Sequence, residues 1–181
     1  MSGPALIHLA TGNRHKLGEF QALARAAALA LEFGLVERMP AVEEDTGTFE
    51  GNARKKAAAV QAVLPPGSWV LADDSGLCVD ALGGAPGVES AYYAGAAGDP
   101  AANFRKLVDV MRGVPAGRRG AAFVCVLVLR GPGGREVIFT GRCPGALRDD
   151  PEGGGGFGYD PLFVPEGHTG TFARSEEHTS E

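Results

Sequence analysis

The sequence predicts an α/β fold in which a long mixed central sheet is flanked by helices. Strand-like apolar runs alternate with helical patterns between residues 5 and 111, a longer apolar run follows at residues 121–129, and a hairpin pattern comes next at residues 136–142. Alternation of strands and helices is typical of a parallel sheet, whereas a hairpin adds antiparallel strands. The two patterns in one chain therefore indicate a mixed sheet.

The elements of the first half follow from hydrophobic spacing. Residues 5–10 form a short apolar run with β-branched content, which predicts the first strand. Apolar residues at helical spacing predict a helix over residues 16–31, which Gly34 would cap. The alanine-rich residues 49–63 predict a second helix, which the two prolines that follow it would stop. Residues 69–72 predict a brief buried strand.

The elements of the second half begin with a capping signal. The pair Asp99-Pro100 has the form of a helix cap followed by proline at the first helical position, so a third helix should run to about residue 111. Residues 121–129 are apolar on both alternating faces, which predicts a central strand covered on both sides. A turn of glycines and proline leads into the hairpin partner at residues 136–142. The glycine run at residues 153–156 predicts a loop.

The composition is that of one globular domain with a small-molecule ligand. The chain has 181 residues, 44% of them hydrophobic and 22% charged. The net charge of −5 argues against polymeric nucleic acid as a partner, because duplex-binding proteins usually carry a basic excess. The three cysteines lie far apart without metal-ligand spacing. We see neither a signal peptide nor a membrane span, and expect a soluble, cytoplasmic protein with no membrane partner.

A candidate phosphate loop follows the first predicted strand and opens a helix. It reads Thr11-Gly12-Asn13-Arg14-His15-Lys16. A helix N-terminus carries unpaired N–H groups and a partial positive charge, so it attracts anions. Three basic-type residues in the first turn run against that preference, and an anionic ligand such as a phosphate would remove the conflict. The alternative is a solvated turn with basic residues by accident, since the run lacks the Walker signature.

An acidic run follows the predicted strand at residues 69–72 and is expected to form a turn. It reads Asp73-Asp74-Ser75-Gly76. Two adjacent carboxylates at the end of a buried strand repel each other and are costly to desolvate. A divalent cation would offset this cost, and Mg²⁺ prefers one or two carboxylates together with phosphate oxygens. A carboxylate beside the metal could deprotonate an attacking water. The alternative is an Asx-type turn without a ligand.

Two further clusters have both a functional and an ordinary interpretation. The acidic run Glu43-Glu44-Asp45 precedes Asn52 and the basic run Arg54-Lys55-Lys56, and such charges usually form a solvated face. The segment Phe157-Gly158-Tyr159-Asp160 could form a slot for a nucleobase, because aromatic faces stack on bases. Ordinary core packing explains an isolated aromatic residue equally well.

Taken together and in this order, these segments resemble the inosine-triphosphate pyrophosphatase family, which acts on noncanonical purine nucleoside triphosphates. The similarity covers nearly everything from Leu6 to Ala173, and four motifs in the right order and spacing are specific. The matching pieces are Ala10-Thr11-Gly12-Asn13-x-x-Lys16, then Thr48-Phe49-Glu50-x-Asn52-Ala53-x-x-Lys56-Ala57, then Ala72-Asp73-Asp74-Ser75-Gly76-Leu77-x-Val79-Asp80-Ala81-Leu82-Gly83-Gly84-Ala85-Pro86-Gly87, and finally Gly156-Phe157-Gly158-Tyr159-Asp160-Pro161-Leu162-Phe163.

The resemblance implies a reaction, a cofactor and an assembly. The reaction is hydrolysis between the α- and β-phosphates of deaminated or oxidised purine nucleotides such as ITP, dITP and XTP, which gives the monophosphate and pyrophosphate and cleanses the nucleotide pool. The cofactor is Mg²⁺ and the assembly is a homodimer. The family fold has two lobes with the nucleotide in a cleft between them.

The resemblance also implies roles for individual residues. Asp74 matches the proton acceptor and a metal ligand, and Glu44 matches the other acidic metal ligand. Asp73 flanks the site and could assist the proton acceptor. The substrate-contacting residues that it implies are Thr11, Gly12, Asn13, Arg14, His15, Lys16, Lys56, Ser75, Phe157, Gly158, Tyr159 and Asp160.

The resemblance stops near the C-terminus. Family members continue past Ala173 with a helix carrying a lysine and a Ser-His-Arg stretch that reads the purine, whereas residues 174–181 resemble a translated sequencing adapter. We expect a single pyrophosphatase domain over residues 1–173, truncated relative to the family, and a non-native tail over residues 174–181. His178 is not equated with the family histidine, because its neighbours do not match. The alternative function is a nucleotide-binding protein with little or no turnover, which lacks the base-reading segment.

Overall fold

The computed structural model describes residues 5–175, so the expected tail from residue 176 onwards, His178 included, lies outside the described residues. The chain divides into two compact units. The first unit comprises the residues up to Asp74 together with Val126–Thr140, and the second comprises Ser75–Cys125 together with the residues from Gly141 onwards. The elements in chain order are β1 (Ala5–Leu9), α1 (Arg14–Ala26), β2 (Leu31–Leu35), α2 (Phe49–Val63), β3 (Trp69–Val79), α3 (Pro100–Val110), β4 (Gly120–Arg130), β5 (Glu136–Leu147), β6 (Phe163–Pro165) and α4 (Phe172–Ser175).

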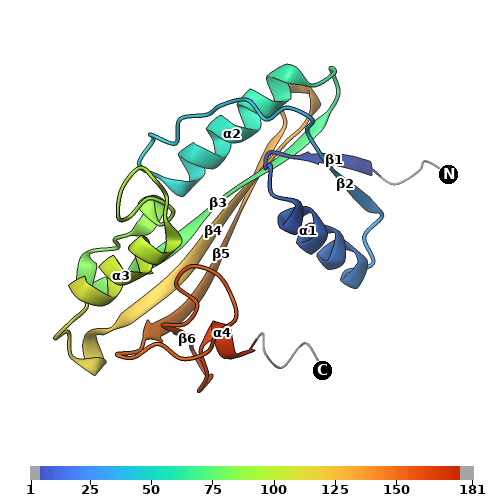
Figure 1. The fold of residues 1–181 in the computed structure, drawn as a ribbon. Coiled ribbons are helices and arrows are strands. Elements are labelled where there is room, and N and C mark those ends of the chain that lie inside the picture. The colour runs from blue at the N-terminus through green and yellow to red at the C-terminus, as the bar shows by residue number, and fades with distance from the viewer. Residues whose placement is uncertain (1–4, 176–181) are drawn as a thin grey trace. The chain divides into compact units, whose positions relative to one another are not determined.

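The strands form one mixed sheet, which confirms the predicted α/β class (Figure 1). The strand order is β2-β1-β3-β4-β5-β6. β1 pairs in parallel with both β2 and β3, whereas β5 and β6 are antiparallel. The chain passes from one unit to the other within β3, β4 and β5. Among the described residues, no helix is both long enough and apolar enough to cross a bilayer.

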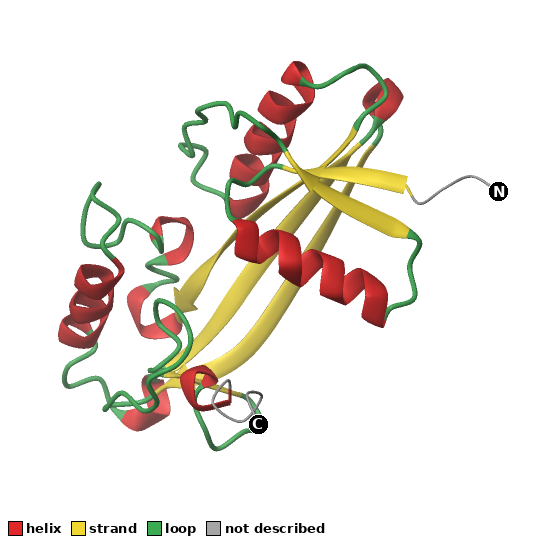
Figure 2. Ribbon diagram, turned by 45° about the vertical axis from the view of Figure 1, so that its right-hand side comes forward, coloured by secondary structure: helices red, strands yellow, loops and turns green. Residues whose placement is uncertain are grey.

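The first unit is built on β1, with β2 and β3 as its parallel neighbours. Leu9 of β1 lies opposite Leu35 of β2 and Leu71 of β3. Leu17 and Phe20 of α1 pack against this apolar cluster, so α1 lies against β2 (Figure 2). On α2 the fully buried residues are Ala53, Ala57, Val60 and the polar Asn52.

The helix predicted over residues 16–31 is wrong at its C-terminal end. α1 ends at Ala26, and Ala28 adopts a φ of +52°, which breaks the helix. Residues 31–35 form β2, and Gly34 lies inside this strand instead of capping a helix. Alanine and leucine satisfy helix propensity throughout the region, but the alternating Leu31 and Phe33 pack on the core beside β1. Tertiary pairing therefore outweighs local propensity here.

The acidic run does not form the predicted turn. β3 continues from Trp69 to Val79, so Asp73 and Asp74 lie within a strand of eleven residues. Leu77 and Val79 are fully buried in the core of the second unit, and this burial favours continuation of the strand over the turn that aspartate, serine and glycine would otherwise favour. Successive side chains of a strand point to opposite faces. Asp73 and Asp74 can therefore have different partners.

The second unit has its own core, to which α3 and strands β3 to β6 contribute. Phe163 is fully buried and lies edge-to-face with Phe123 at 4.8 Å between ring centroids. The predicted start of α3 is confirmed, because Asp99 is the N-cap and accepts a hydrogen bond from the Ala101 amide at 3.0 Å. The sequence did not predict β6 or α4, whose few residues carry no periodic signal.

The central and hairpin strands differ from expectation in extent. β4 lies between β3 and β5, as predicted for a central strand. Its two faces are not equally covered, since Val128 is fully buried while Leu127 and Leu129 are only partly buried. β5 extends to Leu147, five residues beyond the predicted end. Its last residues pair with β6, which residues 136–142 alone could not reveal.

Candidate active site

The predicted phosphate loop lies between β1 and α1, as expected. The Asn13 side chain caps α1 by accepting a hydrogen bond from the His15 amide at 2.9 Å. Thr11 Oγ1 in turn accepts one from the Asn13 amide at 3.1 Å. Gly12, Arg14 and His15 are exposed, and the first turn of α1 contains no acidic residue. The positive end of the helix is therefore not neutralised by a carboxylate within that turn.

The acidic residues lie within β3, just past the residues of β3 that pair with β1. The Ala10 amide donates to the Leu71 carbonyl at 2.8 Å, so the two parallel strands remain in register up to the start of the loop. The chain leaves β1 through α1 to β2 on one side, while β3 lies on the other side. In open α/β sheets, ligands bind beyond the carboxyl ends of strands at such a switch point. The loop and the Asp73-Asp74 pair lie at this position.

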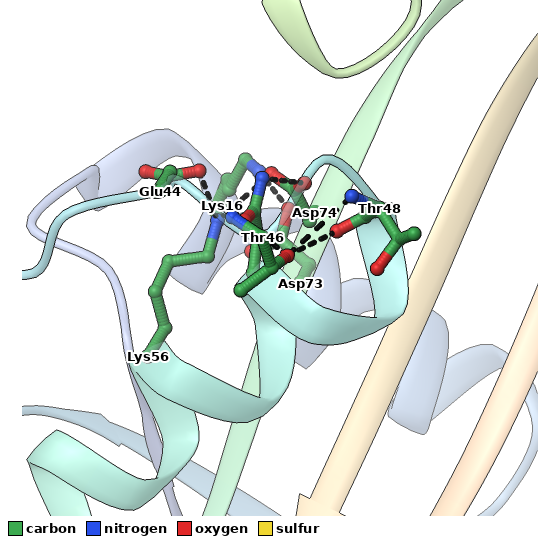
Figure 3. Close-up of polar contacts among 8 residues, drawn as sticks. Lys16, Glu44, Thr46, Thr48, Lys56, Asp73 and Asp74 are labelled. Carbon is green, nitrogen blue, oxygen red and sulfur yellow. Dashed lines mark hydrogen bonds and ion pairs between the residues drawn. The ribbon is translucent and has the colours of Figure 1, made fainter.

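A salt bridge connects the first turn of α1 to β3. Lys16 Nζ contacts Asp73 Oδ2 (Figure 3). The Lys16 side chain keeps 33% of its surface exposed, whereas Asp73 keeps 11%. Asp73 thus holds the lysine of the loop in place, while part of the lysine side chain stays exposed to solvent.

Lys56 of α2 joins the two carboxylates that are predicted to hold a metal. Its Nζ lies 3.0 Å from Asp74 Oδ1 and 3.1 Å from Glu44 Oε2 (Figure 3). Burial raises the pKa of the Asp74 carboxyl above its ordinary value, although the nearby Lys56 ammonium acts against this. For Lys56, burial acts to lower the pKa, but the charges of Asp74 and Glu44 outweigh it and hold the pKa above its ordinary value.

Asn52 is a residue of this site to which sequence reasoning gave no role. It lies in the first turns of α2 and is fully buried. Its Nδ2 donates to Asp74 Oδ2 at 3.2 Å, and its Oδ1 accepts from Thr46. The signal in the sequence was an asparagine within an alanine-rich helix, which is unfavourable for the helix and so requires a partner.

Glu44 and Asp74 fit a hard divalent cation. Their oxygens converge on the same Lys56 nitrogen, which shows that one positive charge can contact both carboxylates. The described residues contain no cluster of three or more side chains able to hold a metal without further ligands. Two carboxylates completed by phosphate oxygens and water match the preference of Mg²⁺.

The remaining predicted site residues belong to the second unit. Ser75 is exposed on β3, and Phe157 keeps 78% of its surface exposed. Asp160 closes a tight turn by accepting a hydrogen bond from the Phe157 amide at 2.7 Å. Gly158, inside this turn, has a φ of +60°, which favours glycine.

Tyr159 is positioned differently from its neighbours. Its ring is 5% exposed and packs in the core of the second unit, and its hydroxyl donates to the Ser90 carbonyl at 2.9 Å. Burial, with a smaller contribution from Tyr93, raises the pKa of Tyr159 to about 12. This burial argues against stacking of Tyr159 on a base, and it makes Phe157 the exposed ring of the segment.

Comparison with known proteins places the chain in a family. A family model described as the Ham1 family matches residues 7–181. The chain belongs to the Ham1 family. It is 54% identical over 178 residues to the dITP/XTP pyrophosphatase of Opitutus terrae, an alignment that covers 94% of this chain and 88% of that relative. It is 42% identical over 165 residues to the dITP/XTP pyrophosphatase of Shouchella clausii, covering 91% and 82%.

Solved structures agree with this assignment. The chain is similar to the nucleoside-triphosphatase/dITP/XTP pyrophosphatase of Mycobacterium abscessus, with a TM-score of 0.79, 39% identity, and coverage of 96% of this chain and 90% of that chain. It is also similar to a HAM1 protein from Coxiella burnetii, with a TM-score of 0.80, 36% identity, and coverage of 93% and 86%. The family resemblance drawn from the four motifs is therefore confirmed.

Proposed function

We propose that this chain hydrolyses dITP, XTP and ITP to the nucleoside monophosphate and pyrophosphate, and so removes noncanonical purine nucleotides from the nucleotide pool. The observation that carries the proposal is the set of charged side chains at the carboxyl end of β1 and in the adjoining part of β3. Two lysines, Lys16 and Lys56, lie there beside three carboxylates that include Asp74. Relatives that are named dITP/XTP pyrophosphatases and cover most of the chain support this assignment.

The loop and the two lysines would bind the triphosphate. The helix N-terminus at Asn13 and the amides after Thr11 offer donors to phosphate oxygens. Lys16 and Lys56 would neutralise charge on the phosphates as the leaving group departs, which stabilises the transition state electrostatically. Asp73 supports this role because its salt bridge keeps Lys16 at the loop.

We propose Mg²⁺ as the cofactor, held by Glu44, Asp74 and the phosphate oxygens. When bound, the ion would supply positive charge that polarises the phosphates. Glu44 lies on the loop before α2 and Asp74 on β3, and both contact Lys56. Enzymes that transfer or cleave phosphoryl groups use positioning and electrostatic stabilisation, so this combination of charges is what the reaction requires.

Asp74 is the proposed proton acceptor. Its carboxylate would take a proton from water as the water oxygen attacks the α-phosphorus in line. The bond from that phosphorus to the bridging oxygen breaks, and pyrophosphate leaves with the electron pair. A buried carboxyl with a raised pKa is a better general base near neutral pH than an exposed aspartate.

The substrate contacts in the second unit are part of the proposal. We assign Ser75 and the Phe157–Asp160 segment to the nucleoside, with the exposed Phe157 ring as the stacking surface. A cleft between two lobes, a homodimer and a cytoplasmic location follow from the family resemblance and remain predictions. The net charge of −5 supports small nucleotides over polymeric nucleic acid as partners.

The test is pyrophosphate release from a panel of triphosphates, with and without Mg²⁺. The panel contains dITP, XTP and ITP, the ordinary nucleotides dGTP and dATP as controls, and modified pyrimidine triphosphates. We expect release from the first three only, and only with Mg²⁺. Binding of dITP without release would favour a nucleotide-binding protein. Release from pyrimidine triphosphates alone would contradict the proposed substrate class while retaining the reaction.

A further inference from the structure

Asn52 connects two segments that each carry a predicted metal ligand. Asp74 lies on β3, and Glu44 lies on the loop before α2, two residues before Thr46. The Asn52 amide bonds to Asp74 on one side and to Thr46 on the other. Figure 3 shows Glu44, Thr46 and Asp74 gathered around the same point of α2.

The orientation of the Asn52 amide follows from its partners. The Thr46 backbone N–H can only donate, and it lies 3.2 Å from Asn52 Oδ1. The Thr46 hydroxyl donates to the same oxygen at 2.7 Å. The ionised Asp74 carboxylate can only accept, so Nδ2 must face it. Each end of the amide is therefore matched to a partner of the opposite kind.

Both oxygens of Asp74 are fixed by this arrangement. Asn52 Nδ2 contacts Oδ2 at 3.2 Å, and Lys56 Nζ contacts Oδ1 at 3.0 Å. Oδ1 is thus the oxygen that shares a cation with Glu44, while Oδ2 is held by a neutral donor. The plane of the carboxylate is set by two side chains from the same helix.

The loop that carries Glu44 and Thr46 also packs closely against the first turn of α2. A Cβ atom at Gly51 would overlap Thr46 Oγ1, so only glycine allows this approach. The Thr48 hydroxyl caps α2 by accepting from the Gly51 amide at 3.0 Å. A buried asparagine in a helix is costly unless it is fully bonded, and alanine would serve the helix better. The close approach of the loop to α2 and the hydrogen bonds at both ends of the Asn52 amide together indicate a specific positioning task.

We propose that Asn52 is a positioning residue that holds Glu44 and Asp74 in the geometry required for the metal-phosphate site. The proposal rests on the proposed function. Asn52 acts through Asp74 directly and through Thr46 on the loop that carries Glu44. Partners that orient metal ligands in this way typically change metal affinity about 10–100-fold when they are removed.

Asn103 provides a matched control. It is a second buried asparagine, 4% exposed, and it occupies the fourth position of α3, as Asn52 does in α2. Its side chain accepts from the Ala94 amide at 2.7 Å and donates to the Ala91 carbonyl at 2.8 Å. Asn103→Ala should therefore cost stability as Asn52→Ala does, but it contacts no predicted metal ligand.

The experiment measures Mn²⁺ binding by electron paramagnetic resonance in the presence of the α,β-imido analogue of dITP, which resists cleavage. We expect Asn52→Ala to weaken Mn²⁺ affinity about 10–100-fold and Asn103→Ala to leave it unchanged. Thr46→Val, at an exposed residue, removes the hydroxyl that bonds Asn52 and Thr48 but keeps the bond from the Thr46 amide to Asn52, and it should weaken the affinity by about two- to tenfold. This variant tests the proposal even where Asn52→Ala does not fold.

Equal Mn²⁺ affinity in the parent and Thr46→Val, or equal loss in the two asparagine variants, would overturn the positioning role. Mn²⁺ binding is measured without turnover. The experiment can therefore contradict the positioning role of Asn52 without contradicting the proposed activity, and the reverse also holds. A parent that released no pyrophosphate but showed the difference between Asn52→Ala and Asn103→Ala would overturn the proposed activity and support the positioning role.

Discussion

The candidate residues of the first unit and those of the second unit are held in place by different forces. In the first unit, the charged residues hold one another, since Lys56 bridges Glu44 and Asp74 through contacts of about 3 Å. In the second unit, the Phe157–Asp160 segment is held by the buried ring of Tyr159 and by a tight turn. Electrostatic contacts position one set, and apolar packing positions the other.

This difference has a consequence for how each region responds to substitution. In the first unit Lys16 and Glu44 are partly exposed and Asp74 is buried beside Lys56. Neutral replacements that keep the shape of a side chain should change the chemistry more than the fold. Ser75 and Phe157 of the second unit are exposed, whereas Tyr159 belongs to the unit's hydrophobic core. Substitutions there should change stability, and Phe157 is the exception that separates the two effects.

The largest expected effect is that of Asp74→Asn in the first unit. Loss of the proton acceptor should lower kcat for dITP by about 10²–10⁴-fold. The chain should still fold, because burial already disfavours the charged form of this carboxyl, whose pKa is raised. Some stability should be lost, because asparagine has one acceptor oxygen where Asp74 accepts from both Asn52 and Lys56. The measurement is pyrophosphate release alongside thermal unfolding. Turnover near the parent level would refute the role assigned to Asp74.

A smaller effect is expected from Phe157→Ala in the second unit. Loss of a stacking ring should raise KM for dITP by an amount that corresponds to about 1–3 kcal/mol, with kcat little changed. Since Phe157 is 78% exposed, unfolding should be unaffected. The control is Phe163→Ala, which removes a fully buried ring and should cost about 3–5 kcal/mol of stability. An unchanged KM in Phe157→Ala would remove the stacking role.

The smallest effect is expected from Tyr159→Phe, which tests the packing role. Loss of the hydrogen bond to the Ser90 carbonyl should cost about 1 kcal/mol at pH 8. Because the pKa of Tyr159 is raised to about 12, an unfolded tyrosine ionises first, and the parent loses stability as the pH rises from about 10 towards 12. The variant lacks this loss, so the difference in free energy of unfolding between the parent and Tyr159→Phe should become smaller as the pH rises. Urea unfolding at pH 8 and pH 11 measures both values, and a gap that widens would contradict the burial of this hydroxyl.

Local structure was predicted well where a few neighbouring residues decide it. α2 has the predicted bounds, and α3 begins at its predicted cap. The phosphate loop also has its predicted place, with Asn13 as the cap of α1. In each case the deciding contact joins residues two or three positions apart, and such hydrogen bonds are encoded in the local sequence.

Prediction failed where a distant partner outweighed a local preference. Residues 31–35 have helical composition, but they pair with β1 and form an edge strand. Asp73 and Asp74 have the composition of a turn, but buried residues beyond them extend β3. For Tyr159 the sequence left both base stacking and core packing open, and the structure buries its ring. None of these outcomes can be read from a window of a few residues.

By itself, the sequence determined the family, the kinds of chemical group at the site and the starts of α2 and α3. Only the tertiary structure decided which lysine meets which carboxylate, and that Asn52 joins Asp74 to the loop of Glu44. Lys16 and Asp73 are 57 residues apart, and Asn52 and Asp74 are 22 apart. The physical reason is the separation in sequence over which each kind of interaction acts. Backbone preferences and caps act between near neighbours, whereas these pairings depend on the register of β1 beside β3 and on the packing of α2.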